Sequence, residues 1–184
     1  MSNGGDCSND PVEFSRFFWF WWGMKTKSLT LSLTFLFFFS SFSVVFADDY
    51  RDGFDAYERK DYETAYKLWL PLAGKGHARA QTALGLMYDI GQGVPQDYKE
   101  ASKWFRLAAE QGDADAQFNV GLVYAKGQGT PQDYVLAHMW FSLAGSQGVE
   151  DAFHNRDVIE KKMSPQQLEK AREMARNWKP KKML

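Results

Sequence analysis

Two glycine-rich segments are the first places where this chain could do chemistry. Gly91 and Gly93 lie in Gly-Gln-Gly-Val-Pro, and Gly127 and Gly129 lie in Gly-Gln-Gly-Thr-Pro. A Gly-x-Gly turn can present backbone amides to a phosphate, but the established phosphate-binding motifs also contain a third glycine or a Gly-Lys-Ser/Thr, and they follow a strand. Both segments lack these additions. We therefore interpret each glycine pair as the end of a helix followed by a turn.

The histidines, serines and cysteine form no known catalytic or metal-binding motif. His77, His138 and His154 have no second ligand at helical spacing, and Cys7 is the only cysteine. Gly-x-Ser-x-Gly, His-Glu-x-x-His and Ser-x-x-Lys do not occur in the sequence. The sequence therefore predicts no catalytic residue, no metal and no cofactor. An enzyme stays open as an alternative, because a fold can carry catalytic groups without a short motif.

The charge distribution excludes a general nucleic-acid binder. Such proteins are clearly basic, whereas this chain has a formal net charge of −1. Residues 48–155 carry 10 basic and 16 acidic side chains, a net charge of −6, and residues 156–184 carry 9 basic and 4 acidic ones, a net charge of +5. The basic tail 179–184 could contact an anionic membrane or an acidic partner. A solvated, frayed end is the simpler interpretation.

The first 47 residues have the pattern of an export signal preceded by an extension. Two lysines after Met24 precede an apolar stretch, Leu29 to Phe46, and Ala47 precedes the acidic Asp48. This order is typical of a secretory signal peptide. We assign residues 24–47 to a signal peptide cleaved near Ala47-Asp48 and residues 1–23 to a misassigned start site. The mature protein is then periplasmic or secreted; an inner-membrane anchor made by the uncleaved stretch is the alternative.

The rest of the chain, residues 48–178, is an internal repeat. Residues 77–112 align with residues 113–148, and 20 of the 36 positions are identical. Weaker matches extend the pattern to 53–76 and 149–178. A period of this length is typical of solenoids, in which each unit buries its apolar face against the next unit.

Each unit is predicted to contain two helices. The first spans residues 78–90 and ends at Gly91, and Gly85 lets a neighbouring helix approach closely. The second begins at Asp97, which has the capping-box partner Glu100, and ends at Gly112. Its buried stripe is predicted to consist of Ala101, Trp104, Phe105 and Ala108, and the large side chains Trp104 and Trp140 are expected to fill the space beside the alanines of the facing helix. Ser164 and Gln167 predict a second capping box, which starts a terminal helix with Trp178 on its apolar face.

The segment from Ala78 to Gly112 resembles the Sel1-like repeat. The shared pattern is Ala-x-Ala-Gln-x-x-Leu-Gly-x-x-Tyr-x-x-Gly-x-Gly-Val-x-x-Asp-Tyr-x-x-Ala-x-x-Trp-Phe-x-x-Ala-Ala-x-x-Gly. The resemblance covers Gly53 to about Trp178, with degenerate units at both ends. It implies an all-α fold, namely a right-handed α-solenoid of helix-turn-helix repeats, related to the tetratricopeptide repeat and closed by terminal capping helices. It also implies a role in binding other proteins.

By similarity to tetratricopeptide arrays, one face of the first helices should line a concave groove. Its residues vary between units, as a groove that contacts an irregular ligand requires; a merely solvated face is the alternative. The predicted groove residues are Arg79, Thr82, Leu86, Asp89, Asp115, Phe118, Leu122, Lys126, His154 and Lys161. Phe118 is the expected anchor, and Lys126, Lys161 and Lys162 favour an acidic peptide.

We therefore interpret the chain as an exported, non-catalytic scaffold or adaptor of bacterial type that binds an unidentified protein or peptide. The alternative is a cell-envelope enzyme, or an accessory of one, that acts on peptidoglycan or polysaccharide.

Overall fold

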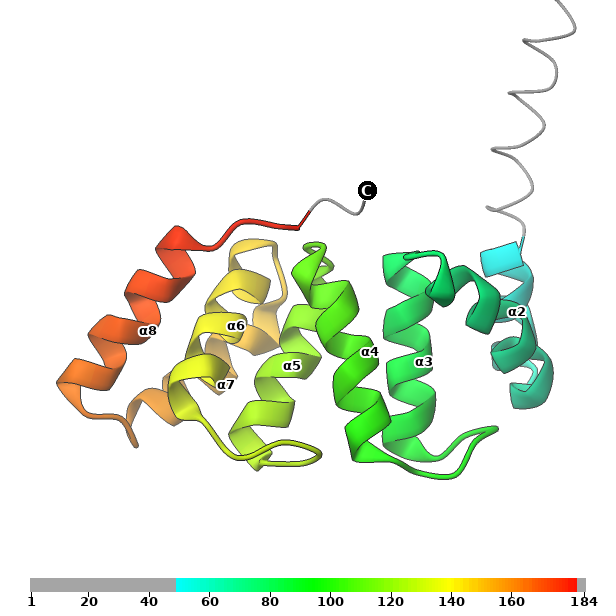
Figure 1. The fold of residues 1–184 in the computed structure, drawn as a ribbon. Helices are drawn as coiled ribbons and strands as arrows, with labels where there is room; N and C mark the ends of the chain where they lie inside the picture. The colour runs from blue at the N-terminus through cyan, green and yellow to red at the C-terminus, as the bar shows by residue number, and fades with distance from the viewer. Residues whose placement is uncertain (1–48, 182–184) are drawn as a thin grey trace, which may run out of the picture. The chain divides into compact units, whose positions relative to one another are not determined.

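The structure, a computed structural model, describes residues 49–181, and within that range it contains helices and no strand. Residues 49–58 are helical. They are followed by α2 (Tyr62–Gly74), α3 (Ala78–Ile90), α4 (Tyr98–Glu110), α5 (Ala114–Lys126), α6 (Tyr134–Ser146), α7 (Glu150–Glu160) and α8 (Pro165–Asn177). Each helix from α2 to α6 packs on the next, and α8 packs on α6 (Figure 1). The predicted α-solenoid of helix-turn-helix repeats is confirmed.

The helices begin where the predicted capping residues stand. The Asp97 carboxylate accepts hydrogen bonds from the amides of Lys99 and Glu100, and Asp113 accepts one from Ala116 N at 2.9 Å. These side chains satisfy amides that have no partner in the first turn of a helix. Glu100, which was expected to complete a capping box, contacts Lys103 Nζ at 3.1 Å instead. The capping box at Ser164 is present as predicted.

The Gly-x-Gly segments end helices and touch the preceding unit. Gly91 and Gly127 have φ values of 80° and 72° and terminate α3 and α5. A Cβ atom placed on Gly129 would lie 2.1 Å from the carbonyl oxygen of Tyr98, the first residue of α4. The glycines therefore allow a left-handed turn and a close approach between units, as the structural interpretation of these motifs predicts.

Phe105 and Phe141 fill the space opposite the glycines of the first helices. Phe105 and Phe141 are almost completely buried. A Cβ atom on Gly85 would lie 2.5 Å from the Phe105 ring, and one on Gly121 would lie 2.5 Å from the Phe141 ring. Trp104 is only half-buried, so its assignment to the fully buried stripe is wrong. Adjacent residues of a helix point about 100° apart, so Trp104 packs beside the core that contains Leu84 and stays partly exposed. Trp140, the equivalent residue one repeat later, is buried beside Phe141 as predicted, because Trp178 covers it.

A glutamine ladder joins successive units. Gln81 Nε2 donates to the Ala73 carbonyl oxygen at 2.9 Å, and Gln81 Oε1 accepts from Gln111 Nε2 at 2.7 Å. One repeat later, Gln117 and Gln147 form the same contact at 2.8 Å. Because Gln81 and Gln117 are buried, their side-chain amides cannot form hydrogen bonds with water, and these bonds within the protein satisfy them instead.

The C-terminal segment is docked on the array. Trp178 lies edge-on against Trp140, with ring centroids 6.1 Å apart. Lys181 N donates to the Glu110 carbonyl oxygen at 2.7 Å, and Lys181 Nζ lies 2.8 Å from the Glu110 carboxylate. The Lys181 side chain is exposed to solvent, as the sequence suggested, but the expectation of a frayed end is wrong for this residue, because Glu110 offers both a free helix-end carbonyl and a counter-charge.

The predicted signal peptide and the extension before it lie outside the described residues. Within residues 49–181, no helix combines the length and the apolar character that a bilayer crossing requires.

Candidate functional site

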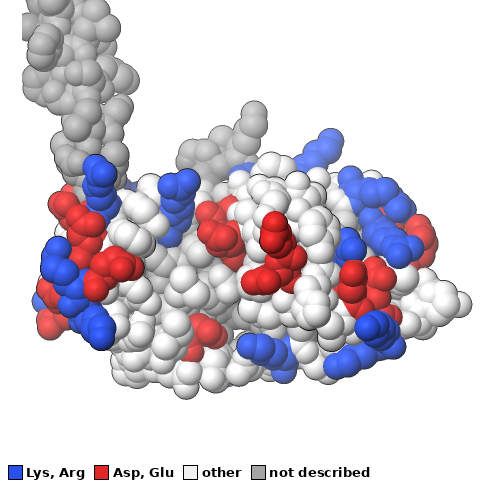
Figure 2. All heavy atoms as spheres, turned by 180° about the vertical axis from the view of Figure 1, so that it is seen from behind, with Lys and Arg blue, Asp and Glu red and all other residues white. Residues whose placement is uncertain are grey.

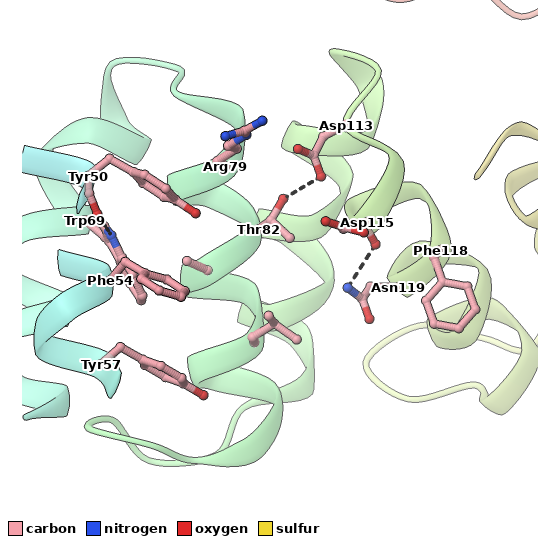
Figure 3. A pocket seen from close by; sticks show the side chains of 12 residues that line it. Tyr50, Phe54, Tyr57, Trp69, Arg79, Thr82, Asp113, Asp115, Phe118 and Asn119 are labelled. Atoms are coloured by element: carbon pink, nitrogen blue, oxygen red, sulfur yellow. Dashed lines mark hydrogen bonds between the residues drawn. The ribbon is translucent and has the colours of Figure 1, made fainter. Parts of the chain in front are cut away.

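A pocket opens between the helical residues 49–58, α3 and α5. Its volume is about 520 Å³. Tyr50, Phe54 and Tyr57 form one wall, and α5 forms the opposite wall with Asp115, Phe118 and Asn119 (Figure 3). The floor between the walls is made by Trp69, Arg79, Thr82, Ala83 and Leu86, with Asp113 at the start of α5. The pocket therefore combines aromatic surface with charged groups contributed by consecutive units.

The aromatic wall is fixed by contacts behind it. Tyr50, Phe54 and Tyr57 are four and three residues apart, so they share one face of their helix. Trp69 Nε1 donates to the Tyr50 carbonyl oxygen at 3.1 Å, and the Tyr57 hydroxyl donates to Gln92 Oε1 at 2.5 Å. Phe54 is 48% exposed, which leaves much of its ring available to a ligand.

The opposite wall offers one aromatic ring and one free carboxylate. The half-buried Phe118 ring packs against Phe141, with centroids 5.8 Å apart. Asp113 Oδ1 is occupied, because it caps α5 and accepts a hydrogen bond from Thr82 Oγ1 at 3.0 Å. Asp115 is exposed, and its carboxylate has no hydrogen bond or ion pair with any of the described residues. Asp115 is thus available for a ligand, whereas Asp113 has a structural role.

Charges of both signs act on the phenol at the top of the pocket. Burial raises the pKa of Tyr50 above its ordinary value. The guanidinium of Arg79 works against this increase, and the carboxylates of Asp113 and Asp115 add to it. Figure 2 shows that acidic and basic side chains are interspersed on the face drawn, most densely toward its two ends. The individual charged side chains that line the pocket, rather than a uniform charge over the whole surface, therefore determine which ligands the pocket can bind.

The structure brings together half of the predicted groove residues. Arg79, Thr82, Leu86, Asp115 and Phe118 line the pocket, and Thr82 does so as a buried side chain. Asp89, Leu122, Lys126, His154 and Lys161 do not line it. Leu122 packs against the core around Phe141, and the three basic side chains among these residues are exposed farther along the array.

Sequence reasoning missed the aromatic wall from the first unit. Seven residues, 91–97, separate α3 from α4, whereas only residues 59–61 separate the first helical segment from α2. Extending the 36-residue period toward the N-terminus therefore misplaces Tyr50, Phe54 and Tyr57 by several positions. Their helical spacing in the sequence was the signal that could have identified them.

The family assignment follows from the repeats. The Sel1 repeat model matches residues 50–77, 78–113 and 114–149, more than half of the chain. The chain belongs to the Sel1 repeat family.

Two solved structures are similar to this Sel1 repeat protein. One is a protective antigen present in uropathogenic Escherichia coli strains that displays an SLR fold, with 31% sequence identity and a TM-score of 0.69 over 72% of this chain and 29% of that one. The other is a Sel1 repeat protein from Oxalobacter formigenes, with 36% identity and a TM-score of 0.56 over 58% of this chain and 44% of that one. The chain thus spans less than half the length of either. No curated protein matches it.

A Ser-His-Glu arrangement at the other end of the Sel1 array is structural. His138 Nε2 lies 2.7 Å from Glu160 Oε1, and Ser142 Oγ lies 3.4 Å from His138 Nδ1. The order resembles a nucleophile, a base and an orienting carboxylate. However, His138 is 1% exposed, and the Ser142 hydroxyl donates to the backbone carbonyl of His138 at 2.8 Å. The imidazole is therefore closed off from a substrate, and the Ser142 hydroxyl is held by a backbone carbonyl rather than by the ring. Among the described residues there is also no group of three or more His, Cys, Asp or Glu that could hold a metal.

Proposed function

We propose that this Sel1 repeat protein is an exported scaffold or adaptor that binds a protein segment in the pocket between its first helix and α5, without catalysis of its own. The observation that carries the proposal is the open aromatic pocket, whose walls come from the first and third repeats and whose floor comes largely from the second. An aromatic side chain held rigidly at a concave site provides a large contact area at a low entropic cost. The segment Leu29 to Phe46, followed by Ala47-Asp48, supports export.

Truncating the two aromatic walls tests this function. Phe118→Ala and Phe54→Ala should each weaken binding of the captured partner by roughly 1–3 kcal/mol, because each removes aromatic contact area from the pocket. Leu107→Ala is a matched control, since Leu107 is an exposed apolar residue of α4 that does not line the pocket. Affinities measured by biolayer interferometry would provide the comparison.

Thermal unfolding of the same variants shows whether they keep the fold. Phe54→Ala should unfold close to the wild-type temperature, because Phe54 is about half exposed. Equal affinities for wild type, Phe54→Ala and Phe118→Ala would contradict the proposed site. Turnover of peptidoglycan or polysaccharide fragments by the purified protein would contradict the non-catalytic role.

Export is tested by the N-terminus of the mature protein. Intact-mass measurement of the protein from the periplasm or the medium should give a chain that begins at Asp48. A chain that keeps residues 24–47 and fractionates with the inner membrane would support an uncleaved anchor instead.

A further inference from the structure

We propose that the pocket recognises a basic side chain, arginine or lysine, of an extended partner segment, with its aliphatic part between Phe54 and Phe118 and its cationic group at Asp115. This inference rests on the proposed function and specifies what the pocket binds.

Three features of the pocket support a cationic ligand. Asp115 presents a carboxylate without a partner among the described residues, and Asp113 adds a second negative charge beside it. Among the residues that the structure describes, the lining holds one positive side chain, Arg79. The helix that supplies the aromatic wall, residues 49–58, carries four acidic residues and one basic residue. The charges in and around the pocket are therefore complementary to a cation.

The aromatic rings add to this preference. The face of a phenyl ring carries negative electrostatic potential and attracts a cation placed above it. Phe54 and Phe118 stand on opposite walls, and Asp115 lies on the same wall as Phe118 (Figure 3). A long side chain that enters between the walls can thus lay its methylene groups along the aromatic surface and keep its charged end at the carboxylate.

An apolar or acidic side chain fits less well. An apolar group would remove water from Asp115 without giving it a partner, which is unfavourable for a carboxylate. An acidic group could pair with Arg79 but would face the negative charges of Asp113 and Asp115. Lys126, Lys161 and Lys162, which favour an acidic peptide in the sequence, do not line this pocket.

The two free charges of the pocket provide an internal control. Asp115 and Arg79 are both exposed, and neither forms an ion pair with any described residue, so neutralising either one should leave the fold intact. A basic ligand is attracted by Asp115 and repelled by Arg79. Asp115→Asn should therefore weaken its binding, and Arg79→Gln should strengthen it.

The experiment uses the full chain in dodecyl maltoside, an uncharged detergent, and fluorescein-labelled heptapeptides of the form Gly-Ser-Leu-X-Leu-Ser-Gly. Position X is arginine, its neutral isostere citrulline, lysine, norleucine or glutamate. Fluorescence anisotropy should show that the arginine peptide binds roughly three- to tenfold more tightly than the citrulline peptide. Asp115→Asn should abolish this ratio, because the proposal places the cationic group at that carboxylate.

The outcomes separate this inference from the proposed function. Equal binding of the arginine and citrulline peptides would overturn the inference and leave the peptide-binding pocket in place. Tighter binding of the glutamate peptide, weakened by Arg79→Gln, would show an acidic ligand and would also overturn it. If none of the peptides binds and the Phe54→Ala variant captures partners as the wild type does, both the inference and the proposed site fail.

Discussion

At the scale of single residues, two equivalent glycines allow close contacts between helices. Gly85 and Gly121 occupy the same position in consecutive units, and each faces a buried phenylalanine ring. The backbone at both positions has ordinary helical angles, so it does not itself require glycine. Glycine is needed because the phenylalanine ring occupies the space where a Cβ atom would lie. Gly74, near the end of α2, has no atom within 4 Å of a Cβ built on it and offers a comparison within the same chain.

Alanine substitutions at Gly85 and at Gly74 should have different effects on stability. Gly85→Ala should lower the free energy of unfolding by roughly 1–3 kcal/mol, because the added methyl group overlaps the Phe105 ring. Gly74→Ala should be neutral or raise it by up to about 1 kcal/mol through helix propensity. Urea unfolding followed by circular dichroism would measure both. A Gly85→Ala variant as stable as Gly74→Ala would contradict the packing described here.

The buried histidine predicts how stability depends on pH. Burial lowers the pKa of His138 below its ordinary value, although Glu160 works in the opposite direction. The positive charges of Arg156 and Arg172 lower it further. The unfolded chain therefore binds this proton more readily than the folded protein, so the stability contributed by neutral His138 is present above about pH 6.5 and decreases as the pH falls below it.

Replacing His138 tests this dependence directly. The free energy of unfolding of the wild type should decrease between pH 7.5 and pH 5.5, and His138→Gln should show a smaller decrease, since it removes the titrating group. The pKa of His77 is also lowered, mainly by burial, so some dependence should persist in the variant. An identical pH profile for the two proteins would show that His138 is not responsible.

The residue types in the sequence predicted the caps better than the core. Asp97, Asp113 and Ser164 cap helices as expected, because an acidic or hydroxyl side chain before an apolar run has few other roles. Trp104 and Phe105 were both placed in the core, yet only Phe105 is fully buried there. A periodic pattern defines an apolar stripe but not the rotation of the helix against its neighbour.

At the scale of the helices, the glutamine ladder holds one unit against the next. Gln117 Nε2 donates to the Ala109 carbonyl oxygen at 3.3 Å, and Gln117 Oε1 accepts from Gln147. Gln117→Leu keeps similar volume but leaves these groups without a partner. We expect it to lower the free energy of unfolding by about 1–3 kcal/mol.

Hydrogen exchange would show where this effect occurs. The amides of α5 and α6 should lose protection in Gln117→Leu more than those of α2 and α3, because units of a solenoid contact only their neighbours. Asn119→Leu is the control, since Asn119 makes a hydrogen bond only within α5, to the Asp115 carbonyl oxygen. If the control lost as much stability as Gln117→Leu, the ladder would not be the cause.

At the scale of the whole array, the fold was more predictable than the site. An exact period fixes the order and packing of the helices, because each unit repeats the same contacts. The pocket, in contrast, lies where the pattern changes: its aromatic wall comes from the shortened first unit, and its α5 wall comes from a regular one. Arg79, Asp115 and Phe118 were found from the repeat, whereas Tyr50, Phe54 and Tyr57 fall outside its register and were recognised only in the three-dimensional arrangement.

The central claim is that the pocket, and not another surface of the array, contacts a protein partner. Site-specific photocrosslinking in cells tests it most directly, with benzoylphenylalanine placed at position 54, on the pocket wall, or at position 107, an exposed position of α4 outside the pocket. We predict a discrete covalent adduct from position 54 that the Asp115→Asn substitution weakens, and none from position 107. Adducts of equal yield from both positions, or an adduct from position 107 alone, would contradict the account.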